Sequence, residues 1–318
     1  MDEISILEEE ILLLASQGNT NIKIGKELYL GTSTVRKYLA QIRSRLGAIN
    51  TTQAVAIMLC KEIYNLLDII ASQQLEIINR KTLRYPLQIA EKDYFLALVL
   101  QLISNSPLGD RLVFKGGTAL HHCYLEQHRF SEDLDFSSGQ LPVSLEDVER
   151  VLTSEEYLDI KKHFQSNATL KIERLRYTGP LGHPNSIKVE IDFLQNVLLP
   201  AQEVPYRNVW GLGFTVKVMD IREICAEKIR AMSDRARYRD FYDVFLLLET
   251  HQLDVQEMLG FIRQKEIRQP IRKTKIFENW KIAISQKEAE IKAIYYSRPI
   301  EDQLIEDVIH SLPFEEIA

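Results

Sequence analysis

The segment from Phe114 to Ser138, FKGGTALHHCYLEQHRFSEDLDFSS, constrains the fold of this chain more than any other part of the sequence. It contains a diglycine turn, Gly116-Gly117, and then a short apolar stretch with helical spacing. It ends in two aspartates one residue apart, within a run that alternates polar and apolar residues. Such alternation is typical of a half-buried β-strand. The segment therefore predicts a strand whose exposed face carries two carboxylates.

The side chains of a strand alternate between its two faces. Leu134 and Phe136 therefore share one face of the predicted strand, and Asp133 and Asp135 share the other. Two carboxylates about 7 Å apart on one face repel each other unless a cation lies between them. Mg²⁺ binds oxygen ligands and usually takes one or two carboxylates together with substrate phosphates. The run SIKVEIDFL places Asp192 on the polar face of another strand, and Asp192 joins the aspartate pair if the two strands are neighbours.

The diglycine turn supplies the groups that a phosphate needs. Gly116 and Gly117 let backbone N–H groups approach a phosphate closely, and a helix that begins near Thr118 favours an anion at its N-terminus. The hydroxyl of Thr118 adds one more donor. A turn of this kind before Asp-x-Asp describes a triphosphate held against one or two Mg²⁺ ions, as in-line nucleotidyl transfer requires. On residue types alone, an ordinary turn and a solvent-facing edge strand remain the alternative.

The composition of the chain limits the classes of protein to which it can belong. With 318 residues, 45% of them hydrophobic, the chain can bury a sizeable core and form two domains. The net charge of −6 excludes a uniformly basic nucleic-acid coat, so any nucleic-acid contact must come from local patches. The three cysteines lack metal-ligand spacing and indicate reduced thiols. Without a signal peptide or a run of ~20 apolar residues, we expect a soluble, cytoplasmic protein with no membrane partner.

The chain divides into an all-helical start, a mixed middle and a helical end. Helical patterns fill residues 1–62, residues 63–85 predict a helical connector, residues 86–220 mix strands with helices, and residues 221–318 are again helical. The predicted strands are RLVFK, SEDLDFS, ATLKIERLRYT, SIKVEIDFL and FTVKVMD. We therefore predict an α+β protein: a small N-terminal all-α domain, a core with a mixed sheet and a helical C-terminal region.

One predicted helix of the N-terminal region is strongly basic. Between Gly31 and Asn50 the sequence has no acidic residue and four basic ones, which are Arg36, Lys37, Arg43 and Arg45. In a helix–turn–helix, a helix of this kind lies in the major groove of DNA, where such side chains reach phosphates and guanine edges. On charge alone, an ordinary solvated helix face is the alternative.

The order of residues in LEEEILLLASQGNTNIKIGKELYLGTSTVRKYLAQIRSRLGAINTTQAVAIM resembles the LuxR-type helix–turn–helix family. The resemblance implies contacts with DNA by Thr32, Ser33, Thr34, Arg36, Lys37 and Arg43. In that family the module usually lies at the C-terminus, whereas here it is N-terminal. The alternatives to a DNA-binding domain for this N-terminal module are therefore an interaction domain and an RNA-binding arm.

The diglycine segment resembles the signature of the AbiEii/AbiGii-type nucleotidyltransferase toxins, which belong to the DNA polymerase β-like superfamily. Both family motifs, Lys-Gly-Gly-Thr-x-Leu and Arg-Phe-Ser-x-Asp-hydrophobic-Asp, are present. IAEKDYFLALVLQLI resembles the helix before the signature, and IREICAEKIRAMSDRARYRDFYDVFLL resembles a later block. The similarity covers residues 86–250 and implies a polymerase β-like core.

The resemblance also implies roles for particular residues. The nucleotide would be held by Lys115, Gly116, Gly117, Thr118, Arg129, Ser131 and Lys228. The metal ligands would be Asp133, Asp135 and Asp192, and the catalytic set would be these three aspartates with Lys228 and Asp240. Asp243 is the second acidic residue that matches the later block. The implied cofactor is Mg²⁺ or Mn²⁺, and the implied substrate is an NTP.

These features lead to one principal hypothesis and two alternatives. The principal hypothesis is a nucleotidyltransferase toxin of a toxin–antitoxin or phage-defence system that modifies RNA; transfer RNA is the acceptor for some relatives. Its expected partners include DNA, an antitoxin and a second copy of the chain. The alternatives are a transcription regulator that senses nucleotide without catalysis, and an enzyme that acts on a small molecule. The basic tract at residues 261–281, with Trp280, favours a nucleic-acid acceptor, unless it is simply an exposed helix hairpin.

Overall fold

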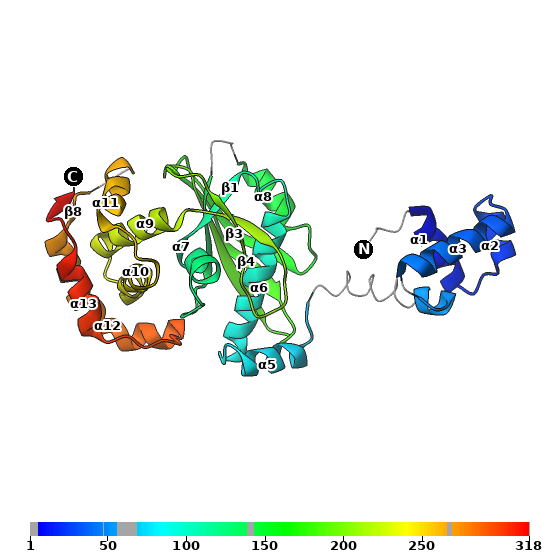
Figure 1. Cartoon of the computed structure of the whole chain (residues 1–318), viewed down its shortest axis with the longest axis horizontal. Coiled ribbons are helices and arrows are strands. Elements are labelled where there is room, and N and C mark those ends of the chain that lie inside the picture. The colour runs from blue at the N-terminus through cyan, green and yellow to red at the C-terminus, as the bar shows by residue number, and fades with distance from the viewer. Residues whose placement is uncertain (1–5, 47, 56–68, 139–142, 266–268, 318) are drawn as a thin grey trace. The chain divides into compact units, whose positions relative to one another are not determined.

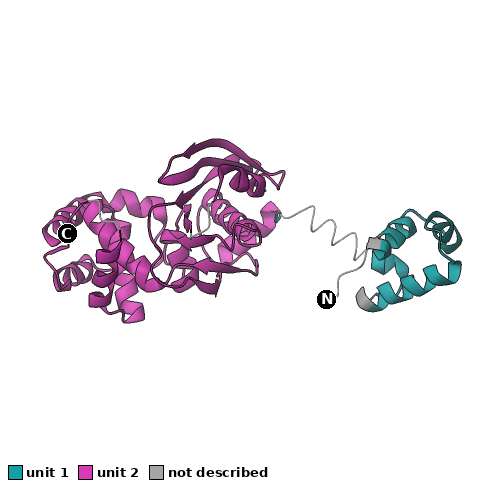
Figure 2. Cartoon of the chain, turned by 90° about the horizontal axis from the view of Figure 1, so that it is seen from above, with its two compact units in different colours: residues 1–70 teal, residues 71–318 magenta. Residues whose placement is uncertain are grey.

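The computed structural model describes residues 6–46, 48–55, 69–138, 143–265 and 269–317 (Figure 1). The chain forms two compact units, residues 1–70 and 71–318 (Figure 2). The predicted connector is described only from residue 69 onwards. There α5 (Ser72–Lys81) packs against α6 (Leu87–Ser104) and so belongs to the second unit. The four-part division of the chain stays a prediction.

The N-terminal unit contains α1 (Ile6–Ser16), α2 (Asn21–Glu27) and α3 (Thr32–Leu46), and residues 51–55 are also helical. Its core consists of Ile11, Leu12, Ile24, Val35, Leu39, Ile42 and Ala54. The turn between α2 and α3 requires Gly25, because a Cβ there would lie 2.6 Å from the backbone oxygen of Leu30. Val35, Leu39 and Ile42 lie about one turn apart and form the buried face of α3. Arg36 and Lys37 lie outside this face and are exposed.

Within the described residues, the second unit contains a seven-stranded mixed sheet of order β3-β4-β5-β2-β1-β7-β6. The strands are β1 (Leu112–Lys115), β2 (Asp133–Ser138), β3 (Leu158–Gln165), β4 (Thr169–Thr178), β5 (Pro184–Asp192), β6 (Gln202–Pro205) and β7 (Thr215–Val218). β2 runs parallel to β5, and β1 runs parallel to β7, while the other neighbours are antiparallel. The two aspartate-bearing strands, β2 and β5, are neighbours, which is the condition on which the approach of Asp192 to the aspartate pair depends.

One face of this sheet is covered by α6, which packs against β2, β5 and β7. Both α5 and α8 (Leu145–Leu152) pack against α6. Because α6 is enclosed by these elements, most of its side chains are buried, which explains its almost continuous apolar sequence. Figure 1 shows the helical C-terminal region on the side of the sheet away from α6. The polar face of β2 and β5 is therefore the one that can carry a site.

The C-terminal region is built around α9 and α10. Its helices are α9 (Ile221–Asp234), α10 (Tyr238–His251), α11 (Val255–Gln264), α12 (Lys273–Ile294) and α13 (Asp302–Ser311). Two short strands, β8 (Ile271–Arg272) and β9 (Glu316–Ile317), pair with each other. α9 packs against α10, α11 and α12, and α10 also packs against α12 and α13. This packing fixes the end of α9 and the start of α10 near the sheet.

The predicted α+β architecture is confirmed. The five predicted strands overlap β1, β2, β4, β5 and β7, whereas β3 and β6 are additional strands. The second half of β3, Lys161 to Gln165, is exposed at the sheet edge and lacks the alternation by which a strand is recognised. In the part of the chain that the structure describes, no helix has the length and apolar content needed to cross a membrane.

Candidate active site

Gly116 and Gly117 bring the turn after β1 against the aspartate strand. Gly116 has a φ of +80°, and a Cβ there would lie 2.5 Å from Oδ2 of Asp135. A Cβ on Gly117 would lie 2.8 Å from both Nη2 of Arg129 and Oγ of Ser131. Glycine has no Cβ and accepts a positive φ, so it satisfies both positions. The turn can therefore lie in direct contact with the side chains of β2 and of the segment before it.

Thr118 does not contribute to the surface of the site. Its side chain is buried, and its hydroxyl donates a 2.6 Å hydrogen bond to the backbone oxygen of Asp133. This bond ties the short helix α7 (Gly116–Ala119) to the start of β2. The phosphate contact expected of Thr118 stays a prediction, and the geometry favours a structural role for its hydroxyl.

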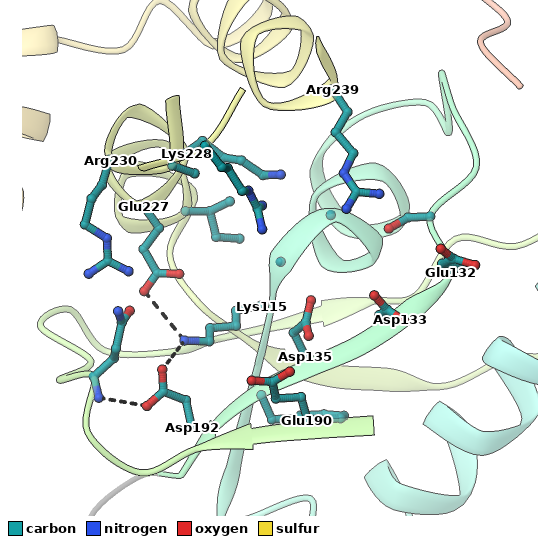
Figure 3. Close-up of a pocket in the computed structure, with 18 of the residues that line it drawn as sticks. Lys115, Glu132, Asp133, Asp135, Glu190, Asp192, Glu227, Lys228, Arg230 and Arg239 are labelled. Atoms are coloured by element: carbon teal, nitrogen blue, oxygen red, sulfur yellow. Dashed lines mark hydrogen bonds and ion pairs between the residues drawn. The ribbon is translucent and has the colours of Figure 1, made fainter. Parts of the chain in front are cut away.

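The parallel register of β2 and β5 aligns charged side chains on one face of the sheet. Asp133 is opposite Lys188, and Asp135 is opposite Glu190. Asp192 lies two residues further along β5. Glu190 is therefore the carboxylate directly beside Asp135 (Figure 3). Glu190 is not among the residues predicted from the sequence, although the alternation in KVEID places it on the same face as Asp192.

The paired aspartates lie in an unfavourable environment for negative charge. Burial raises the pKa of Asp135 to about 6, and the charges of Asp133 and Glu190 act in the same direction. Burial also raises the pKa of Asp133, while the charge of Lys188 opposes this rise. A bound cation would relieve the crowding of these carboxylates. Perturbed carboxylates of this kind in a cleft are frequent in functional sites.

These residues line a pocket of about 410 Å³, here named the charged pocket. Its acidic floor is formed by the strands and includes Asp135 and Glu190 (Figure 3). Its basic roof includes Lys228 and Arg230 from α9 and Arg239 from α10 (Figure 3). Among the described residues that line it, seven side chains are acidic and seven are basic. Carboxylates outnumber cations on the strands and cations outnumber carboxylates on the helices, although Lys188 lies on β5 and Glu227 on α9. This arrangement suits a ligand that combines a cation with a polyanion.

Lys115, at the end of β1, lies between the floor and α9. Its Nζ is 3.4 Å from Oδ2 of Asp192 and 3.8 Å from Oε1 of Glu227. Asp192 also accepts hydrogen bonds from the backbone N–H groups of Leu194 and Gln195. Asp192 is therefore engaged by Lys115 and by its own loop, at one side of the pocket (Figure 3).

The three aspartates predicted to bind a metal ion differ in their surroundings. Among the described residues, no group of three or more His, Cys, Asp or Glu side chains is arranged to hold a metal ion. Lys115 engages Asp192 in this structure, and the role of Asp192 as a third ligand beside Asp133 and Asp135 stays a prediction. Asp133 and Asp135 still fit the pattern in which Mg²⁺ takes two carboxylates and completes its shell with substrate oxygens. The raised pKa of Asp135 is consistent with such a role.

A buried network of ion pairs joins the roof of the charged pocket to the sheet. Asp243 accepts hydrogen bonds of 2.8 and 2.6 Å from Nε and Nη2 of Arg129, and it lies 2.8 Å from Nζ of Lys228. Burial alone would raise the pKa of Asp243, but the charges of Arg129 and Lys228 hold it well below its ordinary value. Burial lowers the pKa of His121 to about 4, so His121 is neutral, and its Nε2–H donates to Asp243 over 3.0 Å.

Asp240 lies behind the roof and does not line the charged pocket. It is fully buried, and its carboxylate accepts hydrogen bonds of 3.0 Å from Lys228 and 2.7 Å from Nε of Arg235. Asp240 therefore orients two cations of the roof. The direct catalytic role predicted for Asp240 stays a prediction, and the geometry favours a positioning role.

The residues predicted to contact DNA lie on α3. Ser33, Arg36 and Lys37 are exposed, and Thr32, Thr34 and Arg43 are half-buried. Nε of Arg43 donates a 3.2 Å hydrogen bond to the backbone oxygen of Leu39, so its own helix engages part of the guanidinium. An exposed helix face with two adjacent cations is suited to contacts with phosphates.

The basic tract at residues 261–281 is largely used for internal contacts. Nζ of Lys265 is buried between Glu223, at 2.7 Å, and Glu227, at 2.8 Å. Nζ of Lys273 donates to backbone oxygens at the end of α13. Trp280 is only 1% exposed and stacks on a tyrosine of α10. Because Trp280 is buried, it adds no exposed ring for a nucleic-acid base to this tract.

A mixed sheet with paired carboxylates, a diglycine turn against them and a basic helical roof defines the nucleotidyltransferase class. The family model described as nucleotidyl transferase AbiEii toxin, type IV toxin–antitoxin system, matches residues 98–307, which is more than half of the 318 residues. The chain belongs to the AbiEii nucleotidyltransferase toxin family. Residues 3–58 match the family of bacterial regulatory proteins of the luxR type, so the N-terminal unit is a LuxR-type helix–turn–helix domain. Both resemblances seen in the sequence are confirmed.

Individual proteins resemble separate parts of the chain. An uncharacterized transcriptional regulatory protein of Bacillus subtilis, YvfU, is 44% identical over 54 residues, which cover 17% of this chain and 27% of that protein. MenT4, a nucleotidyltransferase toxin of Mycobacterium tuberculosis, is 20% identical with a TM-score of 0.49, over 75% of this chain and 98% of that one. JHP933 of Helicobacter pylori is 18% identical with a TM-score of 0.45, over 70% and 92% of the two chains.

Proposed function

We propose that this enzyme transfers a nucleoside monophosphate from an NTP to a hydroxyl group, in a reaction that requires Mg²⁺ or Mn²⁺. The observation that carries the proposal is the opposition of charges in the charged pocket. The carboxylates of Asp133 and Asp135 on the floor face the cations of Lys228 and its neighbours on the roof. When bound, the metal would neutralise and orient the phosphate oxygens.

The residues of the pocket have separate tasks in this reaction. The acceptor oxygen forms a bond to the α-phosphorus, the bond to the pyrophosphate oxygen breaks, and the acceptor proton passes to a carboxylate of the floor. Gly116 and Gly117 bring backbone N–H groups to the phosphates, and Lys228 faces the negative charge that develops on pyrophosphate. Asp240 and Asp243 hold Lys228 in place. Asp192 or Glu190, both on β5, would take the proton.

We further propose that the acceptor is RNA, with transfer RNA as the first candidate, and that an antitoxin controls the activity. Membership in a nucleotidyltransferase toxin family supports growth inhibition through a modified cellular acceptor. A second candidate function is a transcription regulator that binds NTP without transferring it. The N-terminal LuxR-type domain favours this alternative, because it links the pocket to a DNA-binding module in one chain.

The substitution Lys228→Ala separates the enzyme from the sensor. A preorganised cation aimed at developing charge acts mainly in the transition state, so turnover should fall by on the order of 10²–10³ while NTP binding changes much less. Initial rates with labelled NTP and calorimetric NTP binding measure the two quantities on one variant. Lys217→Ala, which removes a lysine of β7 outside the charged pocket, is the control. A loss of NTP affinity without any turnover to lose would favour the sensor.

The double substitution Arg36→Ala with Lys37→Ala tests the N-terminal unit. Each lost phosphate contact should reduce the slope of log affinity against log salt by about one unit, so the double variant should bind its own promoter DNA more weakly and with a flatter slope. Arg80→Ala with Lys81→Ala removes the same two residue types from α5 and should leave the slope unchanged. Wild-type protein whose affinity for this DNA does not depend on salt would contradict the assignment of DNA contacts to α3.

A further inference from the structure

A second pocket, of about 440 Å³, adjoins the charged pocket within the second unit, residues 71–318. The two pockets share Glu190, Asp192, Gln195, Arg230 and Asp234 in their linings. The second, here named the side pocket, is completed by residues that include Thr169 and Lys171 of β4. It therefore extends the charged pocket across β5 and onto β4, away from the diglycine turn.

One row of side chains crosses five strands; its first four members line the two pockets, and its last member, on the edge strand β3, lies just outside their lining. Successive register partners in this row are Lys115 of β1, Asp135 of β2, Glu190 of β5, Lys171 of β4 and Phe164 of β3. Partners that lie opposite each other in neighbouring strands project from the same face of a sheet. The row thus leads from the diglycine turn to the edge strand, where Phe164 is 49% exposed.

The far end of this row has the chemistry of a site for single-stranded nucleic acid. An exposed aromatic ring stacks on a base whatever its identity, and a neighbouring cation contacts the backbone phosphate. Phe164 supplies the ring, and Lys171 beside it supplies the cation, whose Nζ lies 2.8 Å from Oε1 of Glu190 in this structure. Oε1 of Gln195, which lines both pockets, is buried without a hydrogen-bond partner among the described residues. A sugar hydroxyl would provide the donor that this oxygen lacks.

The direction of the reaction also points to the side pocket. In an in-line displacement, the attacking oxygen and the departing group lie on opposite sides of the phosphorus. The diglycine turn lies at the β1 end of the row, where the triphosphate is proposed to bind. The acceptor must then approach from beyond the carboxylates, and the side pocket begins at Glu190 and Asp192.

We propose that the side pocket receives the 3′-terminal nucleotide of a single-stranded RNA, with its base against Phe164 and its hydroxyl directed past Glu190 into the charged pocket. This inference rests on the proposed nucleotidyl transfer and adds the place where the acceptor binds. The reaction is the transfer proposed above: the terminal hydroxyl oxygen of the RNA gains the nucleotidyl group, and pyrophosphate leaves.

The experiment measures equilibrium binding of a 5′-fluorescent single-stranded RNA to the full chain without NTP. Phe164→Ala should weaken binding by about tenfold, which is typical for the loss of one stacked base. His163→Ala is the matched control, because His163 is a neighbouring, similarly exposed ring on the opposite face of β3, paired with the buried Ile172. Its affinity should equal that of the wild type. RNA with a 3′-phosphate should bind more weakly than RNA with a 3′-hydroxyl, because the phosphate would meet Glu190 and Asp192.

Equal binding by wild type and Phe164→Ala, or an equal loss in His163→Ala, would overturn the inference. Indifference to the 3′-phosphate would also overturn it, since the RNA would then bind elsewhere, for example on the N-terminal unit. Binding needs no turnover, so binding that depends on Phe164 without any transfer would contradict the proposed function and leave the acceptor site intact. Transfer to RNA that does not depend on Phe164 would contradict the proposed acceptor site and leave the proposed nucleotidyl transfer intact. Transfer to protein alone would have the same consequence.

Discussion

Asp135→Asn is expected to abolish transfer and at the same time to stabilise the protein in the absence of ligands. Asparagine keeps the size of the side chain but removes the charge that would hold a metal ion, so the rate should fall by on the order of 10³ or more. Removal of the same charge relieves the repulsion from Asp133 and Glu190 and the cost of burial. The free energy of unfolding at pH 7 should therefore rise by ~1–3 kcal/mol.

The pH dependence of this stabilisation has a definite sign. The pKa of Asp135 is about 6 in the folded chain, above its ordinary value of 3.8. Stability associated with this group is thus fully present below about pH 4 and is lost as the pH rises through 6. Urea unfolding of wild type and Asp135→Asn should diverge across this window. Asp159→Asn, at an exposed aspartate of β3, is the control. An unchanged transfer rate, or a less stable variant at pH 7, would contradict the assignment.

Asp243→Asn is expected to cause the largest loss of stability among single substitutions at the site. Asp243 is fully buried and holds the guanidinium of Arg129 in two hydrogen bonds as well as the ammonium of Lys228. Removal of one partner leaves buried charge uncompensated, which costs about 3–5 kcal/mol. Transfer should fall as well, because Lys228 would lose one of the two carboxylates that position it.

The matched control for Asp243→Asn is again Asp159→Asn. Asp159 also pairs with an arginine, Arg176, at 2.8 Å, but both side chains are exposed. An exposed pair is screened by water and contributes little, so the urea midpoint of this control should hardly move. The pKa of Asp243 is depressed, so its contribution is present above the ordinary pKa of aspartate and is lost as the pH falls through the lower, folded value. Equal urea midpoints for the two variants would contradict the role given to the buried network.

Local patterns in the sequence predict much of this fold. The alternation around Asp133 and Asp135 predicts β2, and the same pattern around Asp192 predicts β5. The helical spacing of Val35 and Leu39 predicts the buried face of α3. These predictions succeed because the period of buried side chains is a property of a single strand or helix.

Features that depend on contacts between distant segments are not predicted by such patterns. Glu190 is the neighbour of Asp135 only because of the register between two strands more than 50 residues apart. The pairing of Arg129 with Asp243 joins residues 114 positions apart. The basic residues of the tract at 261–281 look available for nucleic acid in sequence, yet Lys265 is buried between two glutamates. A charge in a sequence does not reveal its partner, so the structure is needed to separate binding groups from internal ion pairs.

The most direct test of the proposed nucleotidyl transfer is to incubate the purified full chain with NTP labelled at the α-phosphate, Mg²⁺ and total RNA. We expect labelled RNA and free pyrophosphate, and we expect both products to be lost when a chelator is added and in Asp133→Ala and Asp135→Asn. Omission of each NTP in turn would identify the nucleotide that is transferred. Wild-type protein that binds NTP under these conditions but transfers label to no RNA, protein or small-molecule hydroxyl would contradict the proposed nucleotidyl transfer and leave the nucleotide sensor as the better description.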